Sequence, residues 1–201
     1  MSAQNGWSKL LESNPGHSQW YVDRFRSLAR DGADLDGEAR LVDAMLPRTA
    51  RVLDAGCGPG RVGAALAAAG HDVVGVDLDP VLIDAARQDH PGPRWLVGDL
   101  AELDLPAQGI TDGFDAIVSA GNVMTFLAPD TRQEVLRRMR LHLRDGGRIV
   151  VGFGTDRGYP VTDFLADMHA ADLVEDLLLA TWDLRPYRDD SDFLVAVLRP
   201  A

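Results

Sequence analysis

From residue 51 onward the chain alternates short β-rich runs with helical patterns, and this alternation most constrains its fold. In chain order the runs read RVLDA, DVVGVD, RWLVGD, FDAIVSA and RIVVGFG, with helical patterns at 62–70 and 80–90 between them. Such alternation favours a parallel sheet covered by helices on both faces. Two later apolar runs, LVEDLLLATWDL and DFLVAVL, flank the polar stretch RPYRDDSD and predict an antiparallel hairpin. We therefore expect an α/β fold, a doubly wound, mostly parallel sheet of about seven strands completed by that hairpin.

Helical patterns also flank this alternation. Upstream, HSQWYVDRFRSLA and DLDGEARLVDAML each place apolar residues on one stripe, which predicts two helices packed on or over the sheet. Downstream, another helix is expected at about 160–171. The helix at 80–90 is expected to begin with Asp79 as its N-cap and Pro80 at its first position. Residues before about Asn14 are expected to fray.

A further helix is expected between the fourth and fifth β-rich runs. Asp130 and Gln133 form a candidate capping pair at its start. The helix is expected to run through Arg144, with the apolar residues Val135, Met139 and Leu143 on one face. The glycines of DGG at 145–147 are interpreted as its C-terminal break.

Composition limits the class of protein. The chain has 201 residues, 46% of them hydrophobic and 25% charged, as in ordinary globular domains. It lacks a signal-peptide pattern and any apolar run near the ~20 residues of a membrane span, and Cys57 is its single cysteine. A cytoplasmic protein is expected. The net charge of −11 disfavours a nucleic-acid partner, because phosphate binding relies on clustered basic residues. The one basic cluster is interpreted as a solvated helix face and comprises Arg137, Arg138, Arg140 and Arg144.

The stretch RVLDAGCGPGRVG at 51–63 joins a strand to three glycines at every second position. Glycines let the backbone approach a ligand closely, and in open α/β folds ligands bind beyond such a turn. The dinucleotide fingerprint G-x-G-x-x-G is not met. Counting from Gly56, its third glycine position holds Arg61, and Gly60 comes one residue early. A nicotinamide or flavin dinucleotide is therefore disfavoured, and a nucleotide-dependent oxidoreductase with it.

The same stretch, Asp54-Ala55-Gly56-Cys57-Gly58-Pro59-Gly60, resembles the first motif of the class I S-adenosylmethionine-dependent methyltransferases, a Rossmann-like family. Later segments resemble further elements of that family in order and spacing: GVDLDP at 75–80, LVGDLAEL at 96–103, FDAIVSAGNV at 114–123 and LRDGGRIVVGFG at 143–154. The resemblance covers roughly residues 50 to 155. It implies S-adenosyl-L-methionine as cofactor and S-adenosyl-L-homocysteine as product.

The resemblance also implies residue roles. Asp77 matches the acid that binds the ribose hydroxyls, Asp99 the acid that meets the adenine amino group, and Leu100 the apolar side chain that packs on the adenine ring. With Asp54, these acids suit a sulfonium cation and would repel a pyrophosphate. The alternative for Asp54 and Asp77 is a purely structural role at a strand end. The expected cofactor contacts are Asp54, Ala55, Gly56, Cys57, Gly58, Gly60, Asp77, Leu78, Asp99, Leu100, Ser119, Ala120, Gly121, Tyr21 and Arg24.

The acceptor side is less constrained. Residues 119–126 are expected to border the reacting methyl group, but they lack the Asp/Asn-Pro-Pro-aromatic signature of amino-group methyltransferases acting on nucleobases and some proteins. Asn122 either positions an acceptor atom or caps the local turn. The catalytic residue is unknown, with Asn122, Tyr21 and His17 as candidates. Arg157 and Tyr159 are either substrate contacts or ordinary loop residues.

The N-terminal helical segment is the candidate lid, because in related enzymes a helix ahead of the core folds across the cofactor. Its side chains either touch ligand or pack the helix on the sheet, and they are Trp20, Tyr21, Arg24 and Phe25. His17 and His169 are the histidines that approach the pocket from the flanking segments in this interpretation, whereas His71 and His90 are expected to be structural and His142 to lie on a helix. No carboxylate–histidine group has ligand spacing, so no metal is expected.

The leading interpretation is a methyltransferase acting on a small-molecule O, N or C nucleophile by in-line displacement. The alternative is a non-catalytic S-adenosylmethionine-binding subunit or sensor. We expect one domain over 1–201, with a lid at 1–48, a cofactor-binding core at 49–155, and a C-terminal helix and hairpin at 156–201. The partner is expected to be a small molecule, with no nucleic acid and no membrane, and the chain a monomer or homodimer.

Overall fold

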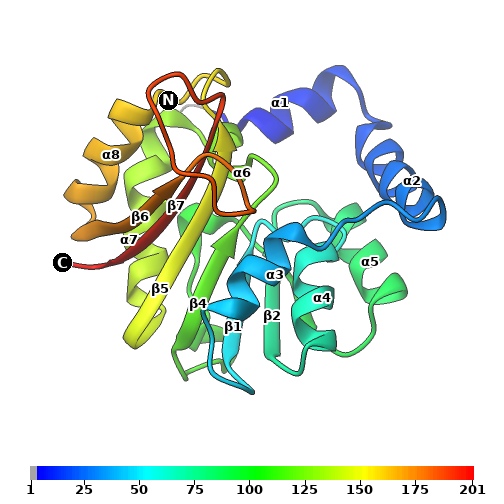
Figure 1. Ribbon diagram of the computed structural model, residues 1–201. Coiled ribbons are helices and arrows are strands. Elements are labelled where there is room, and N and C mark those ends of the chain that lie inside the picture. Colours follow the sequence, from blue (N-terminus) through cyan, green and yellow to red (C-terminus); the bar gives the residue numbers. More distant parts are fainter. Residues whose placement is uncertain (1–3) are drawn as a thin grey trace.

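The computed structural model describes residues 4–201, and its strands form one sheet in the order β3-β2-β1-β4-β5-β7-β6 (Figure 1). Strands β1 to β5 run in parallel, and β7 pairs antiparallel with both β5 and β6. The expected mostly parallel sheet of seven strands with a C-terminal antiparallel hairpin is thereby confirmed. The strands are β1 (Arg51–Ala55), β2 (Asp72–Asp77), β3 (Arg94–Val97), β4 (Phe114–Ser119), β5 (Leu143–Gly154), β6 (Leu173–Leu179) and β7 (Phe193–Pro200).

Helices cover both faces of the sheet and one of its ends (Figure 1). One face carries α3 (Gly37–Ala44), α4 (Arg61–Ala68) and α5 (Pro80–Asp89), and the other carries α7 (Arg132–Leu141) and α8 (Val161–Ala170). Helices α1 (Gly6–Ser13) and α2 (His17–Arg30) form an arm over the carboxyl ends of the strands. Short turns of helix complete the chain: α6 (Val123–Phe126), η1 (Leu100–Glu102), η2 (Pro106–Gln108) and η3 (Pro129–Thr131).

Two apolar clusters, one on each face, explain why the strands read as nearly continuous apolar runs. In β1, Val52 packs in the cluster under α3 and α4, and its neighbour Leu53 packs in the cluster under α7 and α8. Both side chains are fully buried, because a parallel sheet with helices on both faces has no solvent side. Within residues 4–201, every helix is too short or too polar to pass through a lipid bilayer.

Gly75 in β2 provides space for the indole of Trp95. A Cβ atom at Gly75 would lie 2.3 Å from Cε3 and Cζ3 of that ring, closer than any real contact. The buried indole donates from Nε1 to the carbonyl of His90 at 2.9 Å. One glycine in the strand therefore lets a large aromatic side chain fill the gap between β2 and α5.

The expected start of the helix at 130–144 is wrong. Helix α7 begins at Arg132, and its N-cap Thr131 makes no side-chain capping bond. Gln133 points elsewhere, donating from Nε2 to the carbonyl of Ala170 at 3.1 Å. The Gln133 side chain therefore connects α7 to the end of α8 and does not form a capping box at the start of α7.

The expected end of that helix is also wrong. Helix α7 ends at Leu141, and Leu143 already belongs to β5, where it pairs with Phe114. The next pairs are Ala116 with Arg148 onward, so residues 144–147 bulge out of the ladder. Gly146 has φ 75°, which favours glycine, and the DGG stretch serves this bulge within the strand.

The N-terminal expectation fails for residues 6–13. Positions 1–3 of the segment expected to fray lie outside the described residues, but Gly6–Ser13 form α1, capped by Asn5, whose side chain accepts from the backbone N–H of Trp7 at 2.8 Å. The indole of Trp7 packs edge-on against Tyr21 and Phe126, with ring centroids 5.7 and 5.5 Å apart. Tertiary aromatic contacts therefore hold a segment that its own polar sequence would leave loose.

Candidate functional site

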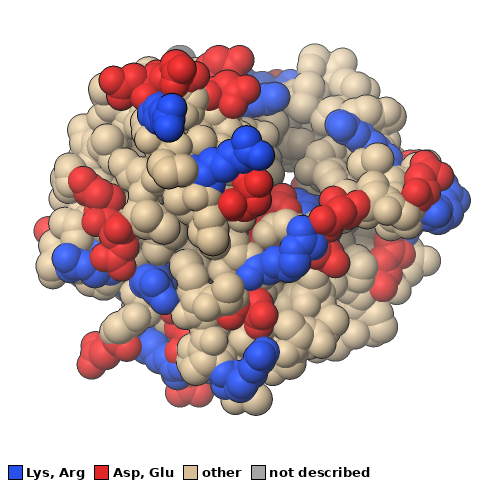
Figure 2. Space-filling view, in the orientation of Figure 1, with Lys and Arg blue, Asp and Glu red and all other residues tan. Residues whose placement is uncertain are grey.

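A cavity of about 920 Å³ lies at the carboxyl ends of the strands, beneath the arm formed by α1 and α2. Figure 2 shows the surface hollowed between this arm and the body of the molecule. The walls come from the turns after β1, β2, β3 and β4, from α2, and from the connection between β6 and β7. This is the location at which open α/β sheets bind their ligands.

The turn after β1 needs its glycines. Gly56, Gly58 and Gly60 have φ angles of 83°, 52° and 85°, a region in which other residues are strained. A Cβ at Gly56 would lie 2.4 Å from a methyl carbon of Val123. Of these three glycines, Gly56 and Gly58 line the cavity.

Asp54, at the end of β1, is a buried carboxylate in the cavity wall, 2% exposed. Its Oδ2 accepts from the backbone N–H of Gly63 at 2.8 Å, which ties β1 to α4. Burial raises the pKa of Asp54 to about 7. The group therefore titrates near neutral pH and gains from a cation placed beside it.

Asp77, at the end of β2, fixes the glycine turn from the other side. Its Oδ2 accepts from the N–H of Gly58 at 2.8 Å, and its Oδ1 accepts from the N–H of Asp79 at 2.9 Å. Burial raises the pKa of Asp77 as well. Two backbone N–H groups therefore fix the carboxylate at the cavity wall. A carboxylate oxygen has more than one lone pair, so this group can still accept a hydrogen bond from a ligand.

Asp99 and Leu100 follow β3 and line the same cavity. The Oδ1 of Asp99 accepts from the N–H of Ala101 at 2.8 Å and so caps the turn η1. The side chain of Leu100 is buried, 5% exposed, and forms an apolar wall next to that carboxylate. An acid beside an apolar surface suits the edge and face of a purine ring.

Helix α2 closes the cavity from above with aromatic side chains. Tyr21 lies over the turn after β4, where its hydroxyl is 3.9 Å from the position that a Cβ on Gly121 would take. Burial raises the pKa of Tyr21. The guanidinium of Arg24 lies 5.5 Å from the ring centroid of Trp20, and both side chains line the cavity.

All three candidate catalytic side chains already have partners. Asn122 has φ 68°, and its Oδ1 accepts from the N–H of Gly154 at 2.8 Å, which joins the turn after β4 to the end of β5. His17 packs edge-on against Trp7 and at a tilt against Trp20, with ring centroids 5.2 and 5.1 Å away. Tyr21 packs against Trp7, with ring centroids 5.7 Å apart. Asn122, His17 and Tyr21 all line the cavity.

Three of the expected cofactor contacts are not among the residues that line the cavity. Ala55 and Ser119 are fully buried within their strands, and Gly60 is buried at the start of α4. Tyr159 is buried between Phe153 and Phe164 and donates to Asp167 Oδ2 at 2.7 Å. That residue is therefore core, whereas Arg157 lines the cavity.

The other histidines make structural contacts. His71 accepts from the N–H of Ala50 at 3.2 Å and bonds Asp43 at 2.9 Å. His142 accepts from the N–H of Leu105 at 3.1 Å, and His90 ends α5. The expected approach of His169 to the pocket is not seen, since it contacts Glu175 at 3.2 Å on the surface. Across residues 4–201, no group of three or more His, Cys, Asp or Glu side chains could hold a metal ion.

Cys57 lines the cavity but is 7% exposed and packs with Ile83, Ala86 and Trp95. Burial raises the pKa of its thiol well above the ordinary value. The thiolate form is therefore scarce at neutral pH, which is the opposite of what a nucleophilic cysteine needs.

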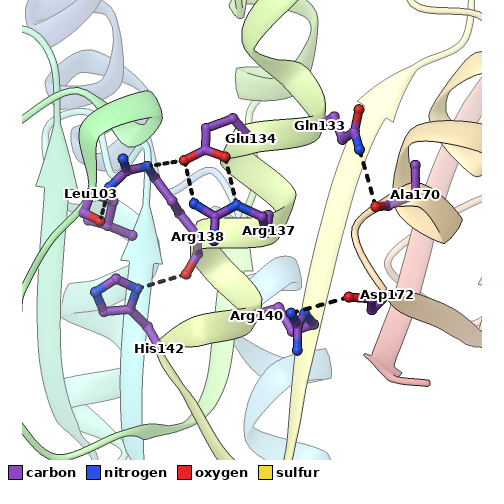
Figure 3. Close-up of polar contacts among 9 residues, drawn as sticks. All are labelled: Leu103, Gln133, Glu134, Arg137, Arg138, Arg140, His142, Ala170 and Asp172. Carbon is purple, nitrogen blue, oxygen red and sulfur yellow. Dashed lines mark hydrogen bonds and ion pairs between the residues drawn. The ribbon is translucent and has the colours of Figure 1, made fainter.

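The arginines of the basic cluster that lie on α7 are paired with neighbouring acids (Figure 3). Glu134 binds Arg137 and Arg138 with contacts of 2.7 and 2.6 Å, and Arg140 reaches Asp172 at 3.4 Å. Arg144, which lies in β5 and not on the helix as expected, is paired with Asp115. These arginines are paired and do not form a free strip for phosphates.

Sequence reasoning missed part of the cavity wall. Glu38 at the start of α3 pairs with Arg61, Oε1 to Nη2 at 2.5 Å, and both line the cavity. No local pattern singled out Glu38, because its partner lies on another helix. The other missed lining residues include Trp7, Leu35, Trp182, Asp192 and Phe193.

Comparison with known proteins extends these observations. A family model described as "Methyltransferase domain" matches residues 52–147. A solved structure, described as a TehB-like S-adenosylmethionine-dependent methyltransferase from Corynebacterium glutamicum, is 50% identical, covers 94% of this chain and 100% of its own, and superposes with a TM-score of 0.87.

Curated relatives are similar over shorter stretches. The magnesium-protoporphyrin O-methyltransferase of Rhodobacter capsulatus is 34% identical over 64% of this chain and 55% of its own. An uncharacterized methyltransferase of Mycobacterium tuberculosis is 41% identical over 57% of each chain. The chain thus spans little more than half the length of these relatives.

Proposed function

The chain belongs to the class I S-adenosylmethionine-dependent methyltransferases, and from that premise we propose that it transfers the cofactor's methyl group to a small molecule. The acceptor atom is an O, N or C nucleophile, and the reaction is an in-line displacement. The sulfonium becomes the thioether of S-adenosylhomocysteine, and the acceptor gains the methyl group and loses a proton. The protein supplies alignment and exclusion of water.

The donor lies along the ends of β1, β2 and β3 in this proposal. Asp77 receives the ribose hydroxyls and Asp99 the adenine amino group, while Leu100 packs on the ring. The rigid bonding of Asp77 to Gly58, at 2.8 Å, supports the first assignment, since the carboxylate need not reorganise on binding. Asp54 faces the positive charge of the donor's amino-acid end.

The arm completes the donor site. Tyr21 lies above the glycine turn, and Arg24 places a cation on the cavity wall. We propose that Arg24 meets the donor carboxylate, the one negative group of the cofactor. Its guanidinium is stacked on Trp20 and has no carboxylate partner among residues 4–201, so it is free to take one.

No dedicated base is required for an acceptor whose nucleophile is already poised. Asn122 serves as a positioning residue: its Oδ1 is used by Gly154, which leaves its NH₂ group to donate toward the cavity. Tyr21 and His17 are the remaining candidates for holding or moving a proton.

The observation that carries the proposal is that one cavity of about 920 Å³ joins the acidic donor wall to an aromatic wall beyond β4. That volume is at the upper end of single-ligand pockets, which is room for a donor and a small acceptor. The paired state of the α7 arginines supports the absence of a nucleic-acid partner.

We further propose one functional unit with a lid at 1–48, a donor-binding core at 49–155 and a C-terminal section at 156–201, working as a monomer or homodimer. The cytoplasm is the proposed compartment. The single cysteine supports it, because a lone buried thiol requires no oxidising environment.

Thermal unfolding with and without S-adenosylhomocysteine tests the proposal. Ligand that binds only the folded chain raises the melting temperature by mass action, so a millimolar concentration should give a clear shift. NAD at the same concentration is the control and should give none. Release of S-adenosylhomocysteine from S-adenosylmethionine in the presence of small-molecule acceptors then reports transfer. No shift with either cofactor or product would contradict the proposal.

A further inference from the structure

The cavity has a second half that the donor leaves unoccupied, and the following inference about it rests on the proposed function. The donor contacts lie at the ends of β1, β2 and β3, on one side of the sheet order. On the other side of β4, the wall is formed by Arg157 after β5, by Phe193 at the start of β7, and by residues 180–182 and 192 of the connection between β6 and β7. This second half is the acceptor compartment.

Its wall is flat and aromatic. Trp182 lies directly on β5, since a Cβ at Gly152 would stand 2.2 Å from Cζ2 of the indole. Phe193 pairs with Gly154 in the β5–β7 ladder, two residues along from Gly152 and therefore on the same face of the sheet. Both rings are half-buried and pack on the same apolar cluster. Flat apolar surfaces of this kind favour a planar ring.

One cation stands free on the same wall. Arg157 lines the cavity and has no hydrogen-bond or ion-pair partner in the described part of the chain. Its Nε lies 3.1 Å from where a Cβ on Gly154 would stand, so its stem lies along the end of β5. Arg61, in the donor half, is by contrast neutralised by Glu38. A free guanidinium fork fits a carboxylate in two-point geometry.

A nearby acid limits the charge that the compartment accepts. Asp192 lines the same wall, and within residues 4–201 its carboxylate has no ion-pair partner. A ligand with two negative groups would place one of them near this carboxylate. The balance of one free arginine and one free aspartate favours a monoanion.

We propose that the methyl acceptor is a planar aromatic molecule carrying one carboxylate, with its ring against Trp182 and Phe193 and its carboxylate on Arg157. The guanidinium then selects the acceptor, while the ring contacts supply most of the buried area. Arg157 is a specificity-determining residue and takes no part in the transfer step.

Calorimetry on the chain saturated with S-adenosylhomocysteine tests this. The probes are 4-hydroxybenzoate, the isosteric and uncharged 4-hydroxybenzamide, and the doubly charged 4-hydroxyphthalate. The benzoate is expected to bind about tenfold or more tightly than the amide, as a charge-assisted pair predicts, and more tightly than the phthalate. Quenching of tryptophan fluorescence by the benzoate should disappear in Trp182→Phe.

Variants assign the discrimination to one residue. Arg157→Met should bind benzoate and amide alike, and Arg157→Lys should keep part of the preference. The matched control is Arg185→Met. Arg185 is an exposed arginine in the connection between β6 and β7, it pairs with Asp183 at 3.5 Å, and it does not line the cavity. It should bind as the unaltered chain does.

Equal binding of benzoate and amide to the unaltered chain, no binding of any probe, or a preference that survives in Arg157→Met would overturn the inference. Each of these results leaves the proposed function standing as long as S-adenosylhomocysteine still binds. Failure of S-adenosylhomocysteine to bind at all would overturn both.

Discussion

The indole Nε1 of Trp7 donates a 2.8 Å hydrogen bond to Oδ2 of Asp79, a residue 72 positions further along the chain. Ser18 Oγ donates to the same oxygen, and the other oxygen, Oδ1, accepts from the N–H of Val81 at 2.9 Å as the N-cap of α5. One buried carboxylate therefore caps a helix of the core and holds α1 and α2 over the cavity. The ion pair between Arg26 and Asp89, at 2.8 Å, is a second connection between α2 and the end of α5.

Loosening this attachment should open the arm. Trp7→Phe keeps the ring packing but removes the bond to Asp79, and Ser18→Ala removes the second bond. Each loses a hydrogen bond to a charged acceptor, so we expect closure to weaken by about 1–2 kcal/mol. Amide hydrogen exchange over residues 6–30 should accelerate, and bound S-adenosylhomocysteine should dissociate faster.

Gln19→Ala is the control for the arm. Gln19 bonds Asp23 within α2, at 3.0 Å, and that contact does not reach the core. It should leave exchange and dissociation nearly unchanged. Unchanged dissociation in both Trp7→Phe and Ser18→Ala would show that the arm does not cover the ligand.

Asp77→Ala should weaken binding of S-adenosylhomocysteine by about 1–3 kcal/mol, or roughly 5- to 150-fold, through loss of charge-assisted bonds. Asp72→Asn, at the opposite end of β2, is the control: Asp72 is exposed and pairs with Arg51 at 2.9 Å. Titration calorimetry measures both. Equal affinity in Asp77→Ala and the unaltered chain would remove the ribose assignment.

Donor binding should depend on pH through Asp54. Its pKa of about 7 in the folded chain means that the carboxyl is mostly neutral below that pH and ionised above it. The donor's cationic end favours the ionised form, so affinity should be full above about pH 8 and fall as pH drops below 7, by up to about tenfold per unit. The comparison is calorimetry of S-adenosylhomocysteine at pH 6, 7 and 8.

Asp54→Asn separates this effect from other titrations. The amide oxygen still accepts from Gly63, but the side chain carries no charge. Its affinity should be low and should vary less with pH than that of the unaltered chain. The same pH slope in both proteins would mean that another group titrates.

Space at Gly75 should control stability. Gly75→Ala places a methyl group 2.3 Å from the ring of Trp95, and overpacking of this kind costs about 1–3 kcal/mol of unfolding free energy. Gly37→Ala is the control, because its new methyl at the first position of α3 would meet only the tip of Arg40, at 3.7 Å. Urea unfolding should show a loss for the first and little or no loss for the second. Equal stability would contradict the packing described here.

Local sequence patterns were sufficient to predict the bounds of strands that are buried on both faces of the sheet. The runs RVLDA and DVVGVD coincide with β1 and β2, because their apolar character and their flanking turn residues mark both ends. The DGG stretch misled for a physical reason. Glycine suits a helix end and a strand bulge equally, and only the pairing of Leu143 with Phe114 decides between them.

The sequence also predicted that the turns after β1, β2 and β3 come together, and residues of all three turns line the cavity. The rest depends on contacts between distant segments. Trp7 looked loose because its partners Tyr21, Phe126 and Asp79 are remote in sequence. Trp182 had no local signal, because its position is set by a glycine in β5.

A crystal structure of the chain with S-adenosylhomocysteine is the most direct test of the central claim, that three acids after successive strands hold an adenosyl donor in this cavity. We expect ribose hydroxyls within about 3.2 Å of the Asp77 carboxylate, the adenine amino group near Asp99, and the sulfur facing Asn122. Adenosine bound outside these acids, or a cavity that stays empty at saturating ligand, would contradict it.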